Sequence, residues 1–291
     1  MTMLPKIIKS SLLSCTLFAL TLGNLASADD RFKDVEIKPI KLSETTYMFV
    51  GSGGNIGVSA GTDGILIIDD QFAPLADKIS AALNQIQAGA PKFIINTHYH
   101  GDHTGANAHF GKNGTIMAHH NVLKRLASDS KTTADALPVI TFEQGITVHF
   151  NGDALKVRHM GPGHTDGDSV VIWSNDNIVH MGDLFFKDKF PYIDLNAGGS
   201  VEGYRDNVAA VLRDLDAQTK VIPGHGALAN KSDLTRFKHM LDASINWMKD
   251  QKASGLTLDQ LKATGMPEKW KDWSWKFISE EQWIETLYQG L

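Results

Sequence analysis

The segment His98-Tyr99-His100-Gly101-Asp102-His103 constrains the fold of this chain more than any other feature. Four side chains that can bind a metal ion stand within six residues, directly after the apolar segment Lys92–Asn96, which we expect to be a buried strand. Neutral imidazoles and carboxylates are ligands that zinc accepts. They can converge on an ion only if the backbone turns sharply, and we expect that turn at Gly101.

Three more candidate ligands follow later apolar segments in the same way. His164 lies in a Gly-Pro-Gly-His-Thr loop, Asp183 follows residues 177–181, and His225 follows Lys220–Ile222. A glycine stands beside each of them. Because loops at one edge of a sheet commonly build a shared site, we predict that these residues join the first cluster in one metal centre.

The remaining pattern alternates strands and helices in two successive blocks. Strands are expected at 35–42, 46–50, 55–60, 65–68, 92–96 and 114–118, and then at 139–143, 145–150, 154–160, 169–173, 177–181 and 220–222. Helices are expected from Pro74 to Gly89, over 200–215, from Asp233, and after Ser279. This order predicts an α+β protein with two face-to-face sheets and helices outside, as a single domain, 29–291, built from two similar halves.

Residues 1–28 are typical of a signal peptide. Lys6 and Lys9 precede an apolar run, Leu12–Leu22, which is too short to span a membrane, and Ala26-Ser27-Ala28 is an A-x-A cleavage site. We therefore expect a periplasmic or secreted protein that begins at Asp29. The alternative is lipidation of Cys15 in a lipobox, although most of the apolar run follows that residue.

The composition excludes several classes of site. Cys15 is the only cysteine, so a chain cleaved after Ala28 has no disulfide, no cysteine nucleophile and no cysteine ligand for zinc. The 28 basic residues are outnumbered by 33 acidic ones, and no basic run occurs. Nucleic acid is therefore not an expected partner.

The order HxHxDH, His, Asp and His resembles the metallo-β-lactamase superfamily of binuclear zinc hydrolases, over nearly all of residues 29–291. The resemblance implies an αββα sandwich with two zinc ions at one edge. By position, the first zinc would be held by His98, His100 and His164. The second would be held by Asp102, His103 and His225. Asp183 would bridge both ions, and Asp69, at the end of the strand Ile65–Ile68, would orient a ligand histidine.

The resemblance also implies a mechanism. Metal-bound hydroxide, oriented by Asp102 as the catalytic residue, would attack the activated carbonyl of a lactone, thioester, ester or, as a weak activity, a β-lactam. Two Zn²⁺ ions with Asp102, Asp183 and hydroxide leave about one net positive charge, so a small anionic substrate is expected.

Asp183 departs from the true lactamases of the superfamily, which carry Cys or Ser at this position. Aspartate is similar to the glyoxalase-type thioesterases and lactonases. Yet Gly161-Pro162-Gly163-His164-Thr165, followed by Val170–Trp173, resembles cysteine-type lactamases. A β-lactamase proper therefore stays open as an alternative.

Two other functional classes are compatible with a histidine cluster. A mononuclear iron oxidoreductase of the persulfide dioxygenase type uses a related cluster, but the full second set of ligands argues against it. A zinc-binding protein without turnover is the other, and the presence of Asp102, the expected orienter of hydroxide, argues against that.

Three further features of the sequence are interpreted without a direct role in catalysis: a serine motif, two loops and the C-terminal tryptophans. Gly57-Val58-Ser59-Ala60-Gly61 matches a nucleophile elbow, but a hairpin rather than a helix follows it. We expect Gly51–Gly54 to form a flap over the metal edge, and loops 51–55 and 184–200 to set specificity. The tryptophans of the C-terminal tail, Trp270, Trp273, Trp275 and Trp283, are expected to pack a helix onto the sheet, and a substrate lid or a dimer contact is the alternative.

Overall fold

The computed structural model describes residues 31–291. The predicted signal peptide, residues 1–28, and Cys15 lie outside the described residues. No helix within residues 31–291 is both long and apolar enough to cross a membrane.

The first sheet has seven strands in chain order. The first four pair antiparallel, and the pairs β4–β5, β5–β6 and β6–β7 are parallel. The strands are β1 (Lys38–Lys41), β2 (Thr46–Val50), β3 (Ile56–Gly61), β4 (Gly64–Ile68), β5 (Pro91–Asn96), β6 (Thr115–His119) and β7 (Ile140–Phe142).

The second sheet has six strands in the order β13-β12-β11-β10-β9-β8. Its pairs are antiparallel except β11–β12, which is parallel. The strands are β8 (Gly145–Phe150), β9 (Asp153–His159), β10 (Ser169–Trp173), β11 (Ile178–His180), β12 (Lys220–Ile222) and β13 (Ala229–Asn230).

Alternating side chains join the two sheets into one core. In β4, Leu66 and Ile68 face a cluster that includes Val171 and Trp173 of the second sheet, whereas Ile67 packs on the other face of β4. Both faces of β4 are covered, which explains its continuous apolar sequence Ile-Leu-Ile-Ile.

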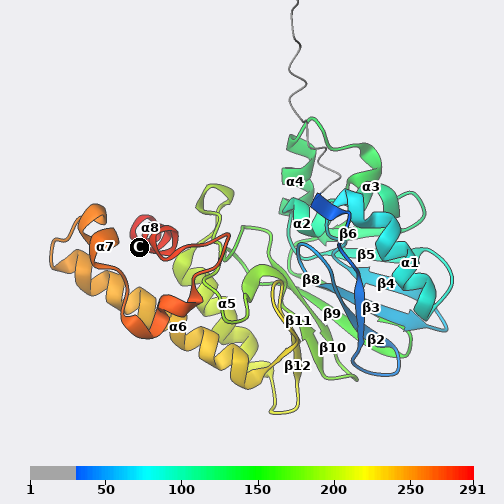
Figure 1. The fold of residues 1–291 in the computed structure, drawn as a ribbon. Coiled ribbons are helices and arrows are strands. Elements are labelled where there is room, and N and C mark those ends of the chain that lie inside the picture. Colours follow the sequence, from blue (N-terminus) through cyan, green and yellow to red (C-terminus); the bar gives the residue numbers. More distant parts are fainter. Residues whose placement is uncertain (1–30) are drawn as a thin grey trace, which may run out of the picture.

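Helices cover the outer faces of both sheets, so the architecture is the predicted α+β sandwich of four layers, αββα (Figure 1). The first outer layer contains α1 (Ala76–Ile86), α2 (Gly101–Thr104), α3 (Asn107–Phe110) and α4 (His120–Ser128). The second contains α5 (Val201–Asp214), α6 (Lys231–Ala253), α7 (Leu258–Thr264) and α8 (Glu280–Gly290). Short 3₁₀ segments are η2 (Ala73–Leu75), η3 (Ala134–Ala136), η4 (Gly182–Leu184), η5 (Leu195–Ala197) and η6 (Glu268–Trp273).

The structure corrects several expected boundaries. The strand expected over 35–42 is only β1, because its residues lie exposed at the edge of the sheet. Helix α6 begins at Lys231 rather than Asp233, because Asn230 and Asp233 form a capping box. Helices α2, α3, α4 and α7 were not predicted, and all have fewer than ten residues, too few for a clear apolar period.

Parallel pairing places several chain turns at one edge of the sandwich. Strands β4 and β5 run parallel and end next to Asp69 and the HxHxDH loop. In the other sheet, β11 and β12 run parallel and end next to Asp183 and His225. This edge therefore receives polar loops from both sheets.

Candidate metal centre

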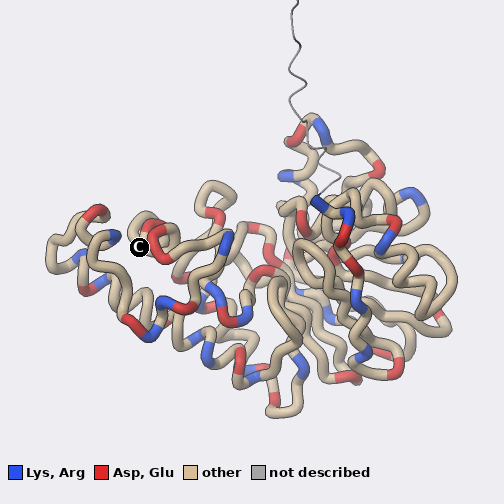
Figure 2. Tube along the Cα trace, in the orientation of Figure 1, with Lys and Arg blue, Asp and Glu red and all other residues tan. Residues whose placement is uncertain are grey.

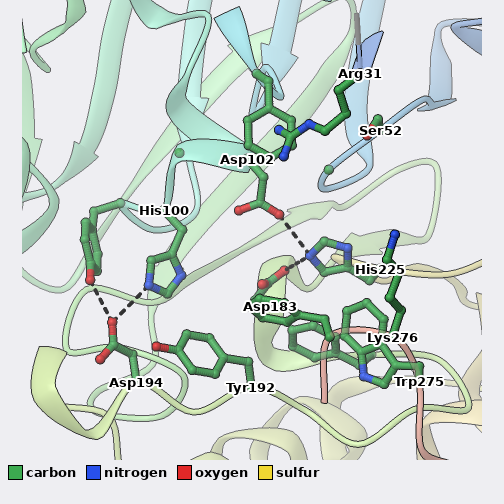
Figure 3. Close-up of a pocket in the computed structure, with 16 residues that line it drawn as sticks. Arg31, Ser52, His100, Asp102, Asp183, Tyr192, Asp194, His225, Trp275 and Lys276 are labelled. Carbon is green, nitrogen blue, oxygen red and sulfur yellow. Dashed lines mark hydrogen bonds and ion pairs between the residues drawn. The ribbon is translucent and has the colours of Figure 1, made fainter. Parts of the chain in front are cut away.

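The seven predicted ligands meet at this edge and form two groups whose ligand atoms lie within 4.8 Å of one another. The first group is His98, His100, His164 and Asp183. The second group is Asp102, His103 and His225. Figure 3 shows Asp183, Asp102 and His225 converging on one side of a pocket, with His100 across from them.

Two imidazoles of the first group face one oxygen of Asp183, and the third contacts one of these two imidazoles. His164 Nε2 lies 3.4 Å and His98 Nε2 lies 3.8 Å from Asp183 Oδ2. His100 Nδ1 lies 2.8 Å from His164 Nε2. His100 thus turns its Nδ1 atom, not its Nε2 atom, toward the group.

The second group faces the other oxygen of the same carboxylate. His103 Nε2 lies 3.0 Å and His225 Nε2 lies 3.3 Å from Asp183 Oδ1. His225 Nε2 also lies 3.3 Å from Asp102 Oδ2. Asp183 therefore stands between the two groups with one oxygen toward each.

Asp69 orients two of the histidines, as the sequence predicted for one. His103 Nδ1 donates to Asp69 Oδ2 at 2.7 Å. The Thr97 hydroxyl donates to the same carboxylate at 2.7 Å and accepts from His98 Nδ1 at 3.1 Å. These bonds leave Nε2 of His98 and His103 directed toward the centre.

The groups that support two further ligand histidines, His100 and His164, were not predicted from the sequence. His100 Nε2 donates to Asp194 Oδ2 at 3.1 Å, and the Tyr99 hydroxyl donates to the same oxygen at 2.7 Å. His164 Nδ1 donates to the backbone carbonyl of Tyr192 at 2.7 Å. Asp194 and Tyr192 lie in the loop after β11, where no sequence motif marks them.

Unpartnered polar atoms at the centre fit a cation. His98 Nε2, His103 Nε2 and Asp183 Oδ1 are buried and form no hydrogen bond of good geometry, although His103 Nε2 and Asp183 Oδ1 lie 3.0 Å apart. Buried groups of this kind are costly unless something satisfies them. Each is an electron-pair donor of a type that zinc binds, so the residues present fit a pair of metal ions.

The protonation of the two groups differs. Burial lowers the pKa of His98 well below its usual value and that of His164 to about 4, so both are neutral near pH 7. Burial also opposes protonation of His103 and His225, but the Asp183 and Asp102 carboxylates outweigh it. They raise the pKa of His103 well above its usual value and that of His225 to about 9. A metal at the second group would have to displace these protons.

Two glycines at the site lie so close to ligand side chains that a larger residue would collide with them. The role predicted for a third glycine, Gly101, is not confirmed. A Cβ atom on Gly224 would lie 2.1 Å from Asp183 Oδ1, and one on Gly54 would lie 2.1 Å from the His103 ring. The predicted sharp glycine turn at Gly101 is wrong. Its φ is not positive and the space beside it is open, because the chain turns by starting helix α2 after the extended His100.

A cavity of about 720 Å³ opens above the two groups. Both predicted specificity loops line it, through Ser52 and Gly53 on one side and Phe186, Tyr192 and Asp194 on another. The Gly51–Gly54 loop lies over the metal edge, where Gly54 N donates to the Asp102 carbonyl at 3.1 Å.

The C-terminal tryptophans have the predicted packing role, and one of them also lines the cavity. Trp273 and Trp283 are buried in the core of the second outer layer, as expected. Trp270 and Trp275 pack against the same core from its edge. Trp275 also lines the cavity, and its ring centroid lies 6.0 Å from that of His225.

A pair of adjacent histidines, His119 and His120, and the predicted Gly57–Gly61 motif lie apart from the centre. His119 stacks on His159 at 3.7 Å, and neither it nor His120 lines the cavity. Ser59 is buried within β3, where its hydroxyl accepts from Asn151, so it is not at a nucleophile elbow.

A four-layer αββα sandwich with two His/Asp groups at the edge of its sheets defines a class of metal-binding proteins. The family model of the metallo-β-lactamase superfamily matches residues 43–225, and the chain belongs to this superfamily. Most members of the superfamily are hydrolytic metalloenzymes.

Two characterised relatives align with part of the chain. The 2,4-dinitroanisole O-demethylase subunit alpha of Nocardioides sp. (strain JS1661) is 29% identical over 134 residues, which are 43% of this chain and 39% of that protein. The hydroxyacylglutathione hydrolase of Nitrosococcus oceani is 30% identical over 146 residues, 49% of this chain and 51% of that protein. The chain thus spans about half or less of the length of these relatives.

Among solved structures, the metallo-β-lactamase from Pontibacter korlensis has a TM-score of 0.61 at 18% identity. The match covers 71% of this chain and 99% of that one. It shows the same fold.

Proposed function

We propose that this protein is a binuclear zinc hydrolase that attacks an activated carbonyl in a lactone, thioester or ester, with β-lactams as weak substrates. The observation that carries the proposal is the position of Asp183. Its Oδ2 atom faces His98 and His164, and its Oδ1 atom faces His103 and His225. One carboxylate shared by two complete ligand groups suits two metal ions, not one.

Most residues at the centre would only hold the metal ions, and one of them would also take part in the reaction. When bound, two zinc ions supply a nucleophile from water near neutral pH and polarise a carbonyl oxygen. Of the two carboxylates at the centre, Asp102 is the more exposed to solvent. The exposed fraction of its side chain is 25%, against 5% for Asp183. Asp102 lines the cavity and can accept a proton from the attacking water, so we assign it the catalytic role.

Two observations favour a hydrolase over an oxidoreductase, and a third disfavours a β-lactamase proper. The second group, Asp102, His103 and His225, is complete, which disfavours a mononuclear iron oxidoreductase. The relative from Nitrosococcus oceani is a hydrolase by name. A β-lactamase proper is disfavoured because Asp183 places a negative charge where a lactam nitrogen would leave.

We expect the partner to be a small anionic molecule and not nucleic acid. Figure 2 shows Lys and Arg interspersed with Asp and Glu along the described chain. The absence of a continuous basic run in the sequence also disfavours nucleic acid.

Metal removal tests the proposed function. We expect the purified protein to contain about two zinc ions per chain and to hydrolyse at least one class within a panel of lactones, thioesters, esters and β-lactams. A chelator should abolish this activity, and Zn²⁺, but not Mg²⁺, should restore it, because imidazole ligands favour zinc. One iron and no zinc in protein from the native host would contradict the proposal, as would a zinc-loaded protein inert toward the whole panel.

We further propose export to the periplasm or the medium, on the evidence of the A-x-A site and the short apolar run. Intact-mass measurement on protein from the native host should give a chain that begins at Asp29. A chain beginning at lipid-modified Cys15 would show membrane anchoring instead, and retention of residues 1–28 would contradict export by this signal.

A further inference from the structure

The wall of the cavity above the metal centre is unusually aromatic on one side. Phe186, Tyr192, Trp275 and Phe277 all line it. Phe186 stacks on His225 with ring centroids 4.9 Å apart, and the Tyr192 ring lies 5.7 Å from that of His100. The wall therefore begins at the ligand histidines, and Figure 3 shows Tyr192 beside His100 and Trp275 beside His225.

The outer part of this wall comes from residues 274–278, between η6 and α8. The family match ends at residue 225, so this segment lies beyond the region that the chain shares with the family model. A substrate preference that depends on residues 274–278 would therefore be specific to this chain and not a general property of the superfamily.

Trp275 is held rigidly in that segment. Its Nε1 atom donates to the Phe190 carbonyl at 2.9 Å, and its backbone N–H donates to the Ile278 carbonyl at 3.0 Å. Lys189 Nζ lies 4.7 Å from the ring centroid, in a cation–π arrangement. A fixed aromatic ring loses little conformational freedom when a ligand packs on it.

Phe277 extends the wall to the mouth of the cavity. Its ring centroid lies 5.6 Å from those of both Tyr192 and Trp275, yet the residue is 56% exposed. A large aromatic side chain at the mouth of a cavity offers apolar surface that a flat ligand group can cover.

Two cations line the same mouth. Lys276 extends from the aromatic segment, and Arg31 lies across the cavity, where its guanidinium is 4.8 Å from the Phe72 ring centroid (Figure 3). Within residues 31–291, neither forms an ion pair. Asp102, Asp183 and Asp194 are less exposed than these two cations, so the chain's own side-chain charges change from negative at the metal centre to positive at the mouth.

We propose that residues 274–278 select the substrate, which carries an aromatic group and a carboxylate. Trp275 and Phe277 pack on the aromatic group, and Lys276 pairs with the carboxylate at the mouth. The reacting carbonyl then lies at the metal centre. This inference rests on the proposed hydrolase function and narrows its substrates to aryl-containing carboxylates.

Binding of unreactive probes tests the selection without turnover. Calorimetry on the zinc-loaded protein would compare 4-phenylbutyrate with butyrate and with 4-phenylbutyramide. We expect 4-phenylbutyrate to bind at least about tenfold more tightly than butyrate, since one buried aromatic ring is worth that much or more. Phe277→Ala and Trp275→Ala should each remove most of this preference, and Lys276→Gln should reduce the preference for the carboxylate over the amide.

Matched controls separate this role from general effects. Val139→Ala shortens an apolar side chain that is 72% exposed and does not line the cavity, and Lys269→Gln removes a nearby lysine that does not line it either. Both should bind all three probes as the wild type does. If Trp275→Ala fails to fold, the exposed Phe277 still decides the aromatic part of the proposal.

Two outcomes would overturn the inference. Equal affinities of 4-phenylbutyrate and butyrate for the wild type would remove the aromatic selection. An undiminished preference in both Phe277→Ala and Trp275→Ala would assign it elsewhere. Thioester turnover separates the proposed hydrolase function from the proposed aryl selection. An aryl preference in binding without any hydrolysis refutes only the hydrolase function. Hydrolysis at equal kcat/KM of two thioesters that differ only in a phenyl or a methyl group on the acyl side refutes only the aryl selection.

Discussion

Replacing Asp183 with alanine is expected to release metal from both ligand groups, whereas His164→Ala and His225→Ala should each empty mainly one. Within residues 31–291, Asp183 is the only residue whose carboxylate oxygens face both groups, at 3.4 Å from His164 Nε2 and 3.3 Å from His225 Nε2. Loss of a group that merely orients a ligand lowers metal affinity about 10- to 100-fold. Loss of a shared ligand should lower the affinity of both sites by at least about a hundredfold.

Metal content after dialysis against a weak chelator measures this effect. The wild type should keep about two zinc ions per chain, each histidine variant about one, and Asp183→Ala close to none. Asp183→Asn is the matched variant, because it keeps the shape and one carbonyl oxygen but loses the charge. An Asp183→Ala protein that retains two zinc ions would show that the carboxylate does not bridge.

The ligands themselves could be read from the sequence because each follows an apolar strand directly. His98 comes after β5, Asp183 after β11 and His225 after β12, and parallel pairing brings such turns to one edge. The glycines beside them reflect close packing, as the 2.1 Å approach of a Cβ on Gly224 to Asp183 demonstrates. Local sequence therefore contained most of the information about the centre.

The residues around the ligands could not be read in the same way. Asp194 supports His100 across 94 positions of sequence, and it lies in a loop without a regular period. Packing is predicted for all the tryptophans of the C-terminal tail, and Trp275 does pack against the core, but it also lines the cavity. Its contact with the cavity depends on how α8 and η6 fold back over the second sheet, which is a tertiary property. Short helices such as α2 escaped prediction because four residues carry no periodic pattern.

Replacing Asp183 with serine is expected to raise the ratio of β-lactam to thioester hydrolysis by about tenfold, even if total activity falls. Attack on the carbonyl is similar for both substrates, but the leaving groups differ. A lactam nitrogen gains negative charge as its bond to carbon breaks, whereas a thiolate is already a stable anion. The carboxylate of Asp183 opposes charge on the nitrogen, and serine removes that charge. A change of only about 1.4 kcal/mol in transition-state stabilisation gives tenfold in rate.

The measurement is kcat/KM for one β-lactam and one thioester, in the wild type and in Asp183→Ser, with zinc kept saturating so that metal loss does not enter. Asp183→Asn serves as the second variant, because it also removes the charge but preserves the size of the side chain. If charge is the cause, the lactam-to-thioester ratio should rise in both variants. Efficient lactam turnover by the wild type, abolished instead of relatively favoured in the serine variant, would show that the charge of Asp183 does not limit departure of the nitrogen.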